Sequence, residues 1–67
     1  MTITLNGAPL ALDGATVASL LALHLDDARP AGVAVAVNDE VVPRGDWSRR
    51  RLVDGDTVEI VTAVQGG

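Results

Sequence analysis

Short stretches of alternating apolar and polar residues run through the chain, which predicts a protein built mainly from β-strands. Ile and Leu occupy alternate positions in residues 3–5 and again in residues 10–12, on either side of Asn6-Gly7. This residue pair accepts two positive φ angles in succession, as a tight turn between antiparallel strands requires. The pattern predicts an amino-terminal β-hairpin over residues 3–12.

The spacing of the apolar residues then changes to that of an α-helix. Thr16 has a hydroxyl that can cap the first turn, and the acids and the proline within residues 26–30 end the pattern. A helix is therefore predicted over about residues 16–25. His24 falls on or beside its apolar stripe near the carboxyl end, so we expect a capping or partly buried histidine. The stripe consists of Val17, Leu20 and Leu21.

Three further strands are predicted in the second half of the chain. Residues 33–37 are a run of Val and Ala, typical of a central strand that the helix covers on at least one face. Asn38-Asp39 turns this strand into a brief return strand over residues 40–42. We expect residues 43–51 to be irregular surface chain, and Trp47 within them to lie in the core or at its margin.

A final strand is predicted over residues 57–64, after a turn formed by Asp54, Gly55 and Asp56. Alternation places Val58 and Ile60 on its buried face and Glu59 and Val61 on the opposite face. Apolar side chains outside the core are a candidate docking surface for a partner. We expect that surface at the end of the last strand, and its residues are Val61, Ala63 and Val64.

The order of these elements indicates an α+β fold. A mixed sheet of four to five strands would pack on one helix, with the first and last strands central and parallel, as in a β-grasp. Ferredoxin-like halves and small barrels also fit the order of elements. We expect one domain over residues 1–64, followed by a flexible tail over residues 65–67.

Composition excludes several kinds of site. The 67 residues contain no cysteine and one histidine, which excludes disulfides, thiolate nucleophiles and sites built from several imidazoles. Five arginines against nine acids give a net charge of −4, which argues against nucleic acid and anionic membranes as partners. Apolar runs are too short to cross a membrane and no export signal is visible, so we expect a cytoplasmic protein.

Internal catalytic chemistry is not indicated either. Ser19 and His24 lie five residues apart on the predicted helix, which is the wrong spacing for a nucleophile and its base. The paired acids at 39–40 and at 54–56 occupy turns, where carboxylates form local hydrogen bonds. Arg49-Arg50-Arg51 is interpreted as a solvated turn, and docking to an acidic patch on a partner protein is the alternative. We therefore expect the chain not to be an enzyme.

The candidate reactive group is the α-carboxylate of Gly67. Gly66 and Gly67 have no side chains, so the tail can enter a narrow enzyme channel. A carboxylate is a poor electrophile, and it reacts with a nucleophile only after activation, most simply adenylation by a partner enzyme that uses ATP. The chain would then be a substrate with no stably bound cofactor of its own.

Several motifs along the chain resemble those of the ThiS family, the ubiquitin-like β-grasp sulfur carriers of thiamine biosynthesis. The strongest match is the last strand, residues 58–64, running into Gly66-Gly67. The other matching motifs are Asn6-Gly7, Thr16-Val17-Ala18 with Leu20-Leu21, Val35-Ala36-Val37-Asn38, Glu40-Val41-Val42-Pro43-Arg44 with Trp47, and Leu52 with Asp54-Gly55-Asp56.

This resemblance implies a mechanism and a set of partners. A ubiquitin-activating-type adenylyltransferase would activate Gly67, and a sulfur donor such as a cysteine desulfurase would convert it to a thiocarboxylate. Thiazole synthase would then take the sulfur. Gln65 stands where many members have a third glycine, and Gln65 and Gly66 would be the residues recognised in the tail.

Two alternatives stay open at this point. The small subunit of molybdopterin synthase shares the fold, the terminal glycines and the thiocarboxylate chemistry, but the approach Thr62-Ala63-Val64 favours the thiamine family. A plain ubiquitin-like interaction module, in which the two glycines are incidental, is the second alternative.

Overall fold

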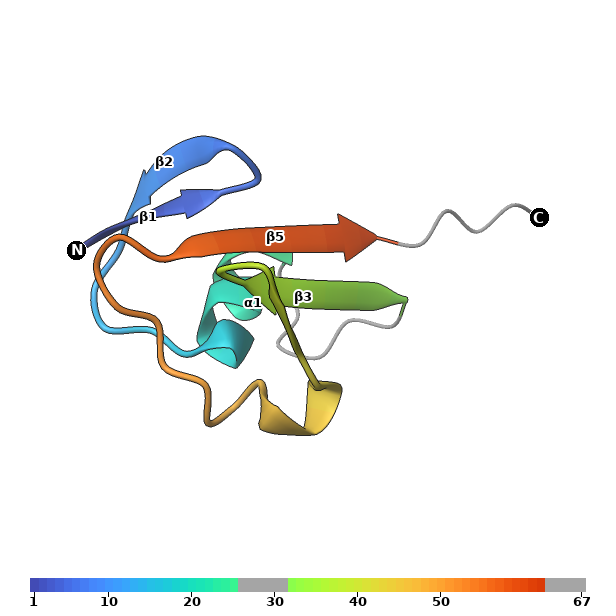
Figure 1. Ribbon diagram of the computed structural model, residues 1–67. Helices are drawn as coiled ribbons and strands as arrows, with labels where there is room; N and C mark the ends of the chain where they lie inside the picture. The colour runs from blue at the N-terminus through green and yellow to red at the C-terminus, as the bar shows by residue number, and fades with distance from the viewer. Residues whose placement is uncertain (26–31, 63–67) are drawn as a thin grey trace.

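Five strands form one mixed sheet in the computed structural model, which describes residues 1–25 and 32–62 (Figure 1). The order across the sheet is β2-β1-β5-β3-β4, and β1 and β5 run parallel while the other neighbours are antiparallel. This arrangement confirms the predicted β-grasp and excludes ferredoxin-like halves and a barrel. The elements are β1 (Thr2–Leu5), β2 (Ala8–Ala11), α1 (Val17–Leu25), β3 (Val33–Val37), β4 (Glu40–Val42), the 3₁₀ turn η1 (Arg44–Asp46) and β5 (Thr57–Thr62).

Both hairpin turns have positive φ angles, which were predicted for Asn6-Gly7, whereas for Asn38-Asp39 only a turn was predicted. Asn6 and Gly7 have φ values of 49° and 85°, and Asn38 and Asp39 have values of 51° and 67°. Glycine accepts this region freely, while short polar side chains tolerate it because they form local hydrogen bonds. The two turns fix the register of β1 with β2 and of β3 with β4.

Helix α1 begins as predicted, with a reciprocal cap. The backbone N–H of Ser19 donates to Thr16 Oγ1 at 3.2 Å, and the N–H of Thr16 donates to Ser19 Oγ at 2.8 Å. The predicted terminators, Asp26, Asp27 and Pro30, lie outside the described residues. No helix in residues 1–25 or 32–62 is long and apolar enough to cross a membrane.

His24 lies in the last turn of α1, as expected, but the expectation of partial burial is wrong, because its side chain is exposed. Val17, Leu20 and Leu21 form the buried stripe, and the stripe continues four residues beyond Leu21 to the partly buried Leu25. His24 therefore lies beside the buried stripe and not in it, although it is only three residues after Leu21.

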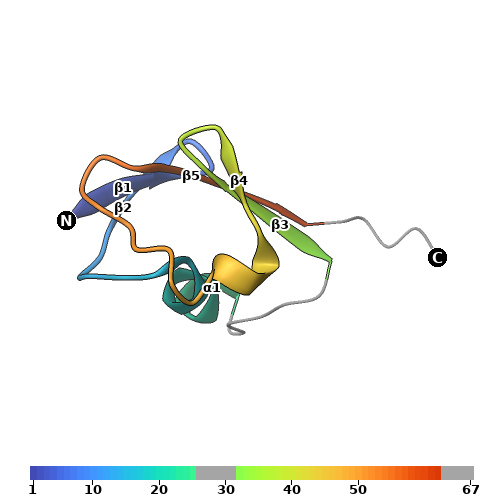
Figure 2. The same ribbon diagram turned by 60° about the horizontal axis from the view of Figure 1, so that its bottom comes forward.

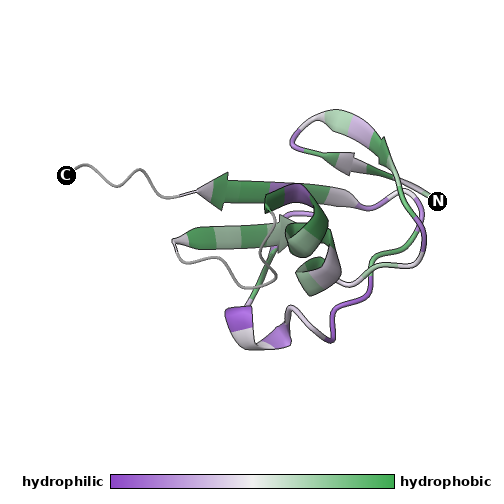
Figure 3. Ribbon diagram, turned by 180° about the vertical axis from the view of Figure 1, so that it is seen from behind, coloured by the Kyte–Doolittle hydropathy of each residue, from purple (hydrophilic) through white to green (hydrophobic). Residues whose placement is uncertain are grey.

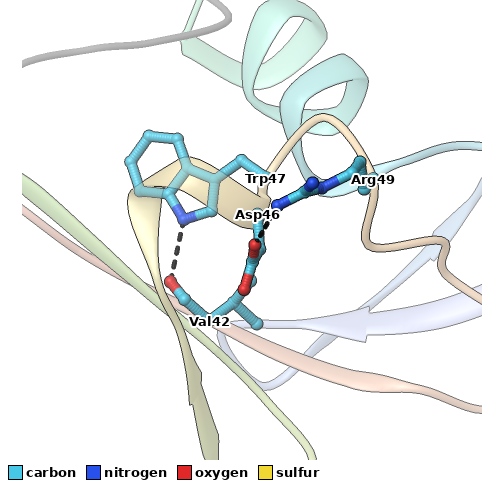
Figure 4. A network of polar contacts seen from close by, with 4 residues as sticks. All are labelled: Val42, Asp46, Trp47 and Arg49. Carbon is cyan, nitrogen blue, oxygen red and sulfur yellow. Dashed lines mark hydrogen bonds and ion pairs between the residues drawn. The ribbon is translucent and has the colours of Figure 1, made fainter.

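Trp47 lies in the core, as predicted, with 2% of its surface exposed. Its indole Nε1–H donates to the carbonyl of Val42 at 3.0 Å (Figure 4). The chain that carries it is more regular than expected, because Arg44–Asp46 form η1. Figure 2 shows η1 and α1 on the same side of the sheet, so Trp47 closes the core between them. The prediction of irregular chain for residues 43–51 was thus wrong for residues 44–46.

Strand β5 has the predicted alternation over the part that the structure describes. Val58 and Ile60 are buried, whereas Glu59 and Val61 are exposed on the opposite face. Val58 and Ile60 belong to the core cluster of the molecule. The predicted continuation of this strand through Ala63 and Val64 lies outside the described residues.

Candidate functional site

The face of the sheet opposite α1 carries a row of small apolar side chains across three strands. In β3, Val35 and Val37 point into the core, so Ala34 and Ala36 point outward. Strand register places Val61 of β5 opposite Ala34, and places Val41 of β4 opposite Ala36. We call these four outward residues the open-face patch: Ala34, Ala36, Val41 and Val61.

The two valines of the open-face patch are well exposed, Val41 at 71% and Val61 at 61%. A contiguous exposed apolar surface indicates a site of protein interaction. Glu59 lies on the same face as Val61 and opposite Ala36, so a carboxylate borders the patch. Figure 3 shows hydrophobic colour along β3 and over most of β5. The arrangement suits a flat apolar partner surface that has a cationic edge.

The predicted docking surface stays a prediction, and the structure shows only which of its residues are exposed. Val61 is exposed as expected, while Ala63 and Val64 lie outside the described residues. Ala34, Ala36 and Val41 were not predicted as docking residues. The alternation in residues 33–37 indicates that Ala34 and Ala36 share one face of the strand. Only the pairing of β3 with β4 and β5 shows that all four residues form one surface.

A side chain from the first hairpin holds the middle of β5 in place. Asn6 Oδ1 accepts a hydrogen bond from the N–H of Ile60 at 2.8 Å, and the N–H of Asn6 donates to the carbonyl of Val58 at 2.9 Å. Pairing with β1 covers only Thr57 and Val58 of this strand. Asn6 therefore adds a hydrogen bond to β5 closer to its carboxyl end, at a position where β1 no longer pairs with the strand.

The carboxylates at the turn before β5 have structural roles, as the sequence predicts. Asp54 Oδ1 accepts from the N–H of Thr2 at 2.8 Å. Asp56, which is buried, accepts from the N–H of Val53 at 2.8 Å and from Asn38 Nδ2 at 2.9 Å. Their oxygens thus stabilise the turn, and no paired-carboxylate chemistry is indicated.

Ser19 and His24 also fail to form a catalytic pair. The Ser19 hydroxyl donates to the carbonyl of Thr16 at 3.0 Å and takes part in the helix cap. His24 lines a groove of about 150 Å³ between β2 and α1, whose other lining residues are Leu10, Ala11, Leu12, Leu20 and Leu23. These side chains supply no nucleophile. Across the described ranges, no three His, Asp or Glu side chains gather to hold a metal ion.

The predicted reactive tail continues from β5 beyond the residues that the structure describes. Gln65, Gly66 and Gly67 are therefore still predictions as site residues. The described part of β5 ends at Thr62, immediately after Val61 of the open-face patch.

Comparison with protein families identifies the chain. The model of the ThiS family matches residues 3–67, nearly the whole sequence. The chain belongs to the ThiS family. Among curated ThiS relatives, the sulfur carrier protein ThiS of Thermus thermophilus is 40% identical over 63 residues, which are 94% of this chain and 95% of that protein. The ThiS of Escherichia coli is 39% identical over 41 residues, which span 61% of this chain and only 62% of that protein.

Solved ThiS structures have the same fold. A crystal structure of the thiamine biosynthesis protein ThiS from Geobacter metallireducens matches with a TM-score of 0.82 and 34% identity, covering 100% of both chains. A solution structure of a thiamine biosynthesis protein from the same organism matches with a TM-score of 0.79 and 34% identity, covering 100% of this chain and 88% of the other. These matches confirm the ThiS-type β-grasp.

Proposed function

We propose that this chain is a sulfur carrier for thiamine biosynthesis and that it carries sulfur at the carboxylate of Gly67. The observation that carries this proposal is the family match, which runs through the tail to Gly67. The two curated relatives are named sulfur carrier proteins, and the solved relatives are described as thiamine biosynthesis proteins. The molybdopterin synthase alternative is not favoured by any of these relatives.

Composition supports a carrier that uses its terminus. The sequence has no cysteine, so no side-chain thiol or persulfide can hold sulfur. A terminal carboxylate can attack the α-phosphate of ATP, forming an acyl adenylate and releasing pyrophosphate. The terminal sulfur of a donor persulfide then displaces AMP from the acyl carbon and forms an acyl disulfide. A thiol attacks the donor's sulfur in this disulfide, which forms a new disulfide with the donor and releases the thiocarboxylate. ATP belongs to the activating partner, and the chain acts as a substrate with no cofactor of its own.

A sulfur carrier of this kind needs partner enzymes for activation and for sulfur transfer. The partners proposed are a ubiquitin-activating-type adenylyltransferase, a sulfur donor such as a cysteine desulfurase, and thiazole synthase as the acceptor. Because these reactions use ATP and metabolic enzymes, the proposed location is the cytoplasm.

The open-face patch is the proposed docking surface for these enzymes, together with Ala63 and Val64. Its small side chains allow a partner to approach the sheet closely, and it leads directly to the tail. Gln65 and Gly66 would be recognised in the channel that admits Gly67, because only a narrow tail can reach an enclosed ATP site. Rigid support of β5 by Asn6 reduces the freedom that docking must remove.

Intact-mass spectrometry tests the function directly. The chain is incubated with the activating enzyme, ATP and a sulfur donor, and the expected result is a mass gain of one oxygen-to-sulfur exchange in the carboxyl-terminal fragment. A reaction without ATP is the control and should leave the mass unchanged. Modification at an internal residue would contradict the proposal, and no modification at all would favour the plain interaction module.

A further inference from the structure

Positive charge is concentrated in one stretch of this acidic chain. Residues 44–51, here called the basic segment, contain four of the five arginines and one acid, Asp46, which gives a net charge of +3. The rest of the chain has one arginine against eight acids, a net charge of −7. Figure 3 shows η1, at the start of this segment, largely in the hydrophilic colour. The molecule therefore has a strong charge asymmetry.

The backbone of the basic segment is held in place along its length. The N–H groups of Arg49 and Arg50 donate to the carbonyl of Asp46 at 3.0 and 2.8 Å. The carbonyls of Trp47 and Arg50 accept from the first turn of α1, each at 2.9 Å, and Arg51 forms a bridge with Thr16. The arginines are thus presented from a rigid support, which lowers the entropy lost on binding.

Arg49 and Arg51 are the exposed arginines at the end of the basic segment, whereas Arg44 lies over the ring of Trp47, 5.0 Å from its centroid. The side chain of Arg49 is 77% exposed and pairs with Asp46 at 2.6 Å (Figure 4). Arg51 is exposed, while Arg50 is half-buried and its guanidinium donates to the carbonyl of Arg51. An exposed ion pair contributes little to stability, so the Arg49–Asp46 pair does not by itself explain three consecutive arginines.

The geometry does not suit a small anion such as free phosphate. At the start of α1, the N–H groups of Val17 and Ala18 donate to the carbonyls of Arg50 and Trp47. The N–H of Ser19 is taken by the Thr16 hydroxyl. No backbone donor of this first turn is therefore aimed at the guanidinium groups. Exposed guanidinium groups along a rigid segment fit carboxylates spread over a protein surface instead.

The position of the basic segment separates it from the open-face patch. The segment packs against the start of α1 on the covered side of the sheet, whereas the patch lies on the opposite face (Figure 2). An enzyme that binds ATP and a terminal carboxylate needs cationic groups around its active site. These cationic groups attract the acidic remainder of this chain but repel the basic segment. The basic segment must therefore contact a different surface of the enzyme.

We propose that the basic segment docks on an acidic patch of the activating enzyme, on a surface separate from the one that covers the open-face patch. This inference rests on the proposed function, because it names the activating enzyme as the partner. The two contacts together select the orientation in which the tail faces the ATP site. Attraction between the opposite charges also speeds encounter of the two proteins at low ionic strength.

The test is the association rate with the activating enzyme, measured by stopped flow over a series of salt concentrations. In the variant R49Q/R51Q, Arg50 keeps its bond to the backbone. Association is expected to be about tenfold slower than for the unaltered chain at low salt, and the difference should vanish at high salt because the charges are then screened. The matched control is D39N/E40Q, two exposed charges on the β3–β4 turn, which should not slow association.

The outcomes separate this inference from the proposed function. Equal association rates for R49Q/R51Q and the unaltered chain at every salt concentration would overturn the docking, even when adenylation is normal. Equal slowing by the control would also overturn it, because the effect would then not belong to the basic segment. Failure of the unaltered chain to be adenylated would overturn the proposed function and this choice of partner together.

Discussion

Short polar side chains join parts of this chain that are far apart in sequence. Asn38 Nδ2 donates to Asp56 at 2.9 Å, and Asn38 Oδ1 accepts from the N–H of Thr57 at the same distance. Asn6 binds Ile60 in a comparable way. Both asparagines also adopt the positive φ that their hairpin turns require. Each asparagine therefore shapes its own turn and also binds β5, the strand that leads to the tail.

The buried Trp47 gives the clearest prediction at this scale. Trp47→Ala removes a side chain that closes the core between α1 and η1, and we expect the free energy of unfolding to fall by about 3 kcal/mol. Urea denaturation followed by circular dichroism measures this change. Trp47→Phe keeps much of the bulk but loses the bond to Val42, and should cost less. Unchanged unfolding of Trp47→Ala would place the ring outside the core.

At the scale of elements, the alternation of side chains along β5 gives the two faces of the strand different surroundings. Its inward residues, Val58 and Ile60, complete the core, and its outward residues face solvent beside β3. Pairing with β3 brings Ala34 next to Val61 and makes a surface that neither strand has alone. The core contacts and the proposed docking contacts of β5 therefore lie on opposite faces of the strand.

This separation predicts that Val61→Asp keeps the fold and weakens binding to both the activating enzyme and thiazole synthase. The new carboxylate would be solvated in the free protein but desolvated against an apolar partner. Affinity is measured by isothermal titration calorimetry, with thermal unfolding as the check on folding. Leu23→Asp is the matched control, because Leu23 is exposed on α1 in the other layer. Unfolding of Val61→Asp, or an equal loss of affinity in the control, would contradict the assignment.

At the scale of the whole molecule, the open-face patch and the basic segment lie on opposite sides of the sheet. The open-face patch lies on one side of the sheet, the basic segment lies on the helix side, and β5 leads toward the tail. None of these carries catalytic chemistry in the part of the chain that the structure describes. This agrees with the proposal that the reactive group is the carboxyl terminus, acted on by another protein.

Adding one alanine after Gly67 tests that proposal. We expect adenylation to be abolished, because small misplacement of reacting groups costs on the order of a hundredfold in rate and the added methyl group obstructs a narrow channel. Thermal unfolding should not change, since the addition lies beyond β5. Adenylation is measured as pyrophosphate release. Leu23→Ala, an exposed change on α1 that leaves the tail unaltered, serves as the control. Full activation of the extended chain would remove the carrier proposal.

Much of the fold could be predicted because local chemistry determines it. Asn6-Gly7 favours one type of turn, Thr16 and Ser19 cap a helix within three residues of each other, and the alternation in β5 sorts its two faces. The missing cysteine likewise limits where sulfur can be held. Each of these depends on backbone preferences, on periodicity or on composition, none of which requires knowledge of distant residues.

The tertiary structure decided what depends on the register between distant segments. Ala34, Ala36 and Val41 join Val61 only through strand pairing, and no spacing in the sequence indicates which outward residues become neighbours. His24 is exposed because the buried stripe of α1 continues to Leu25 and leaves His24 outside it. The basic segment is rigid because the carbonyls of Trp47 and Arg50 accept bonds from the start of α1, about thirty residues earlier in the chain. Such long-range pairings form only when the whole core packs.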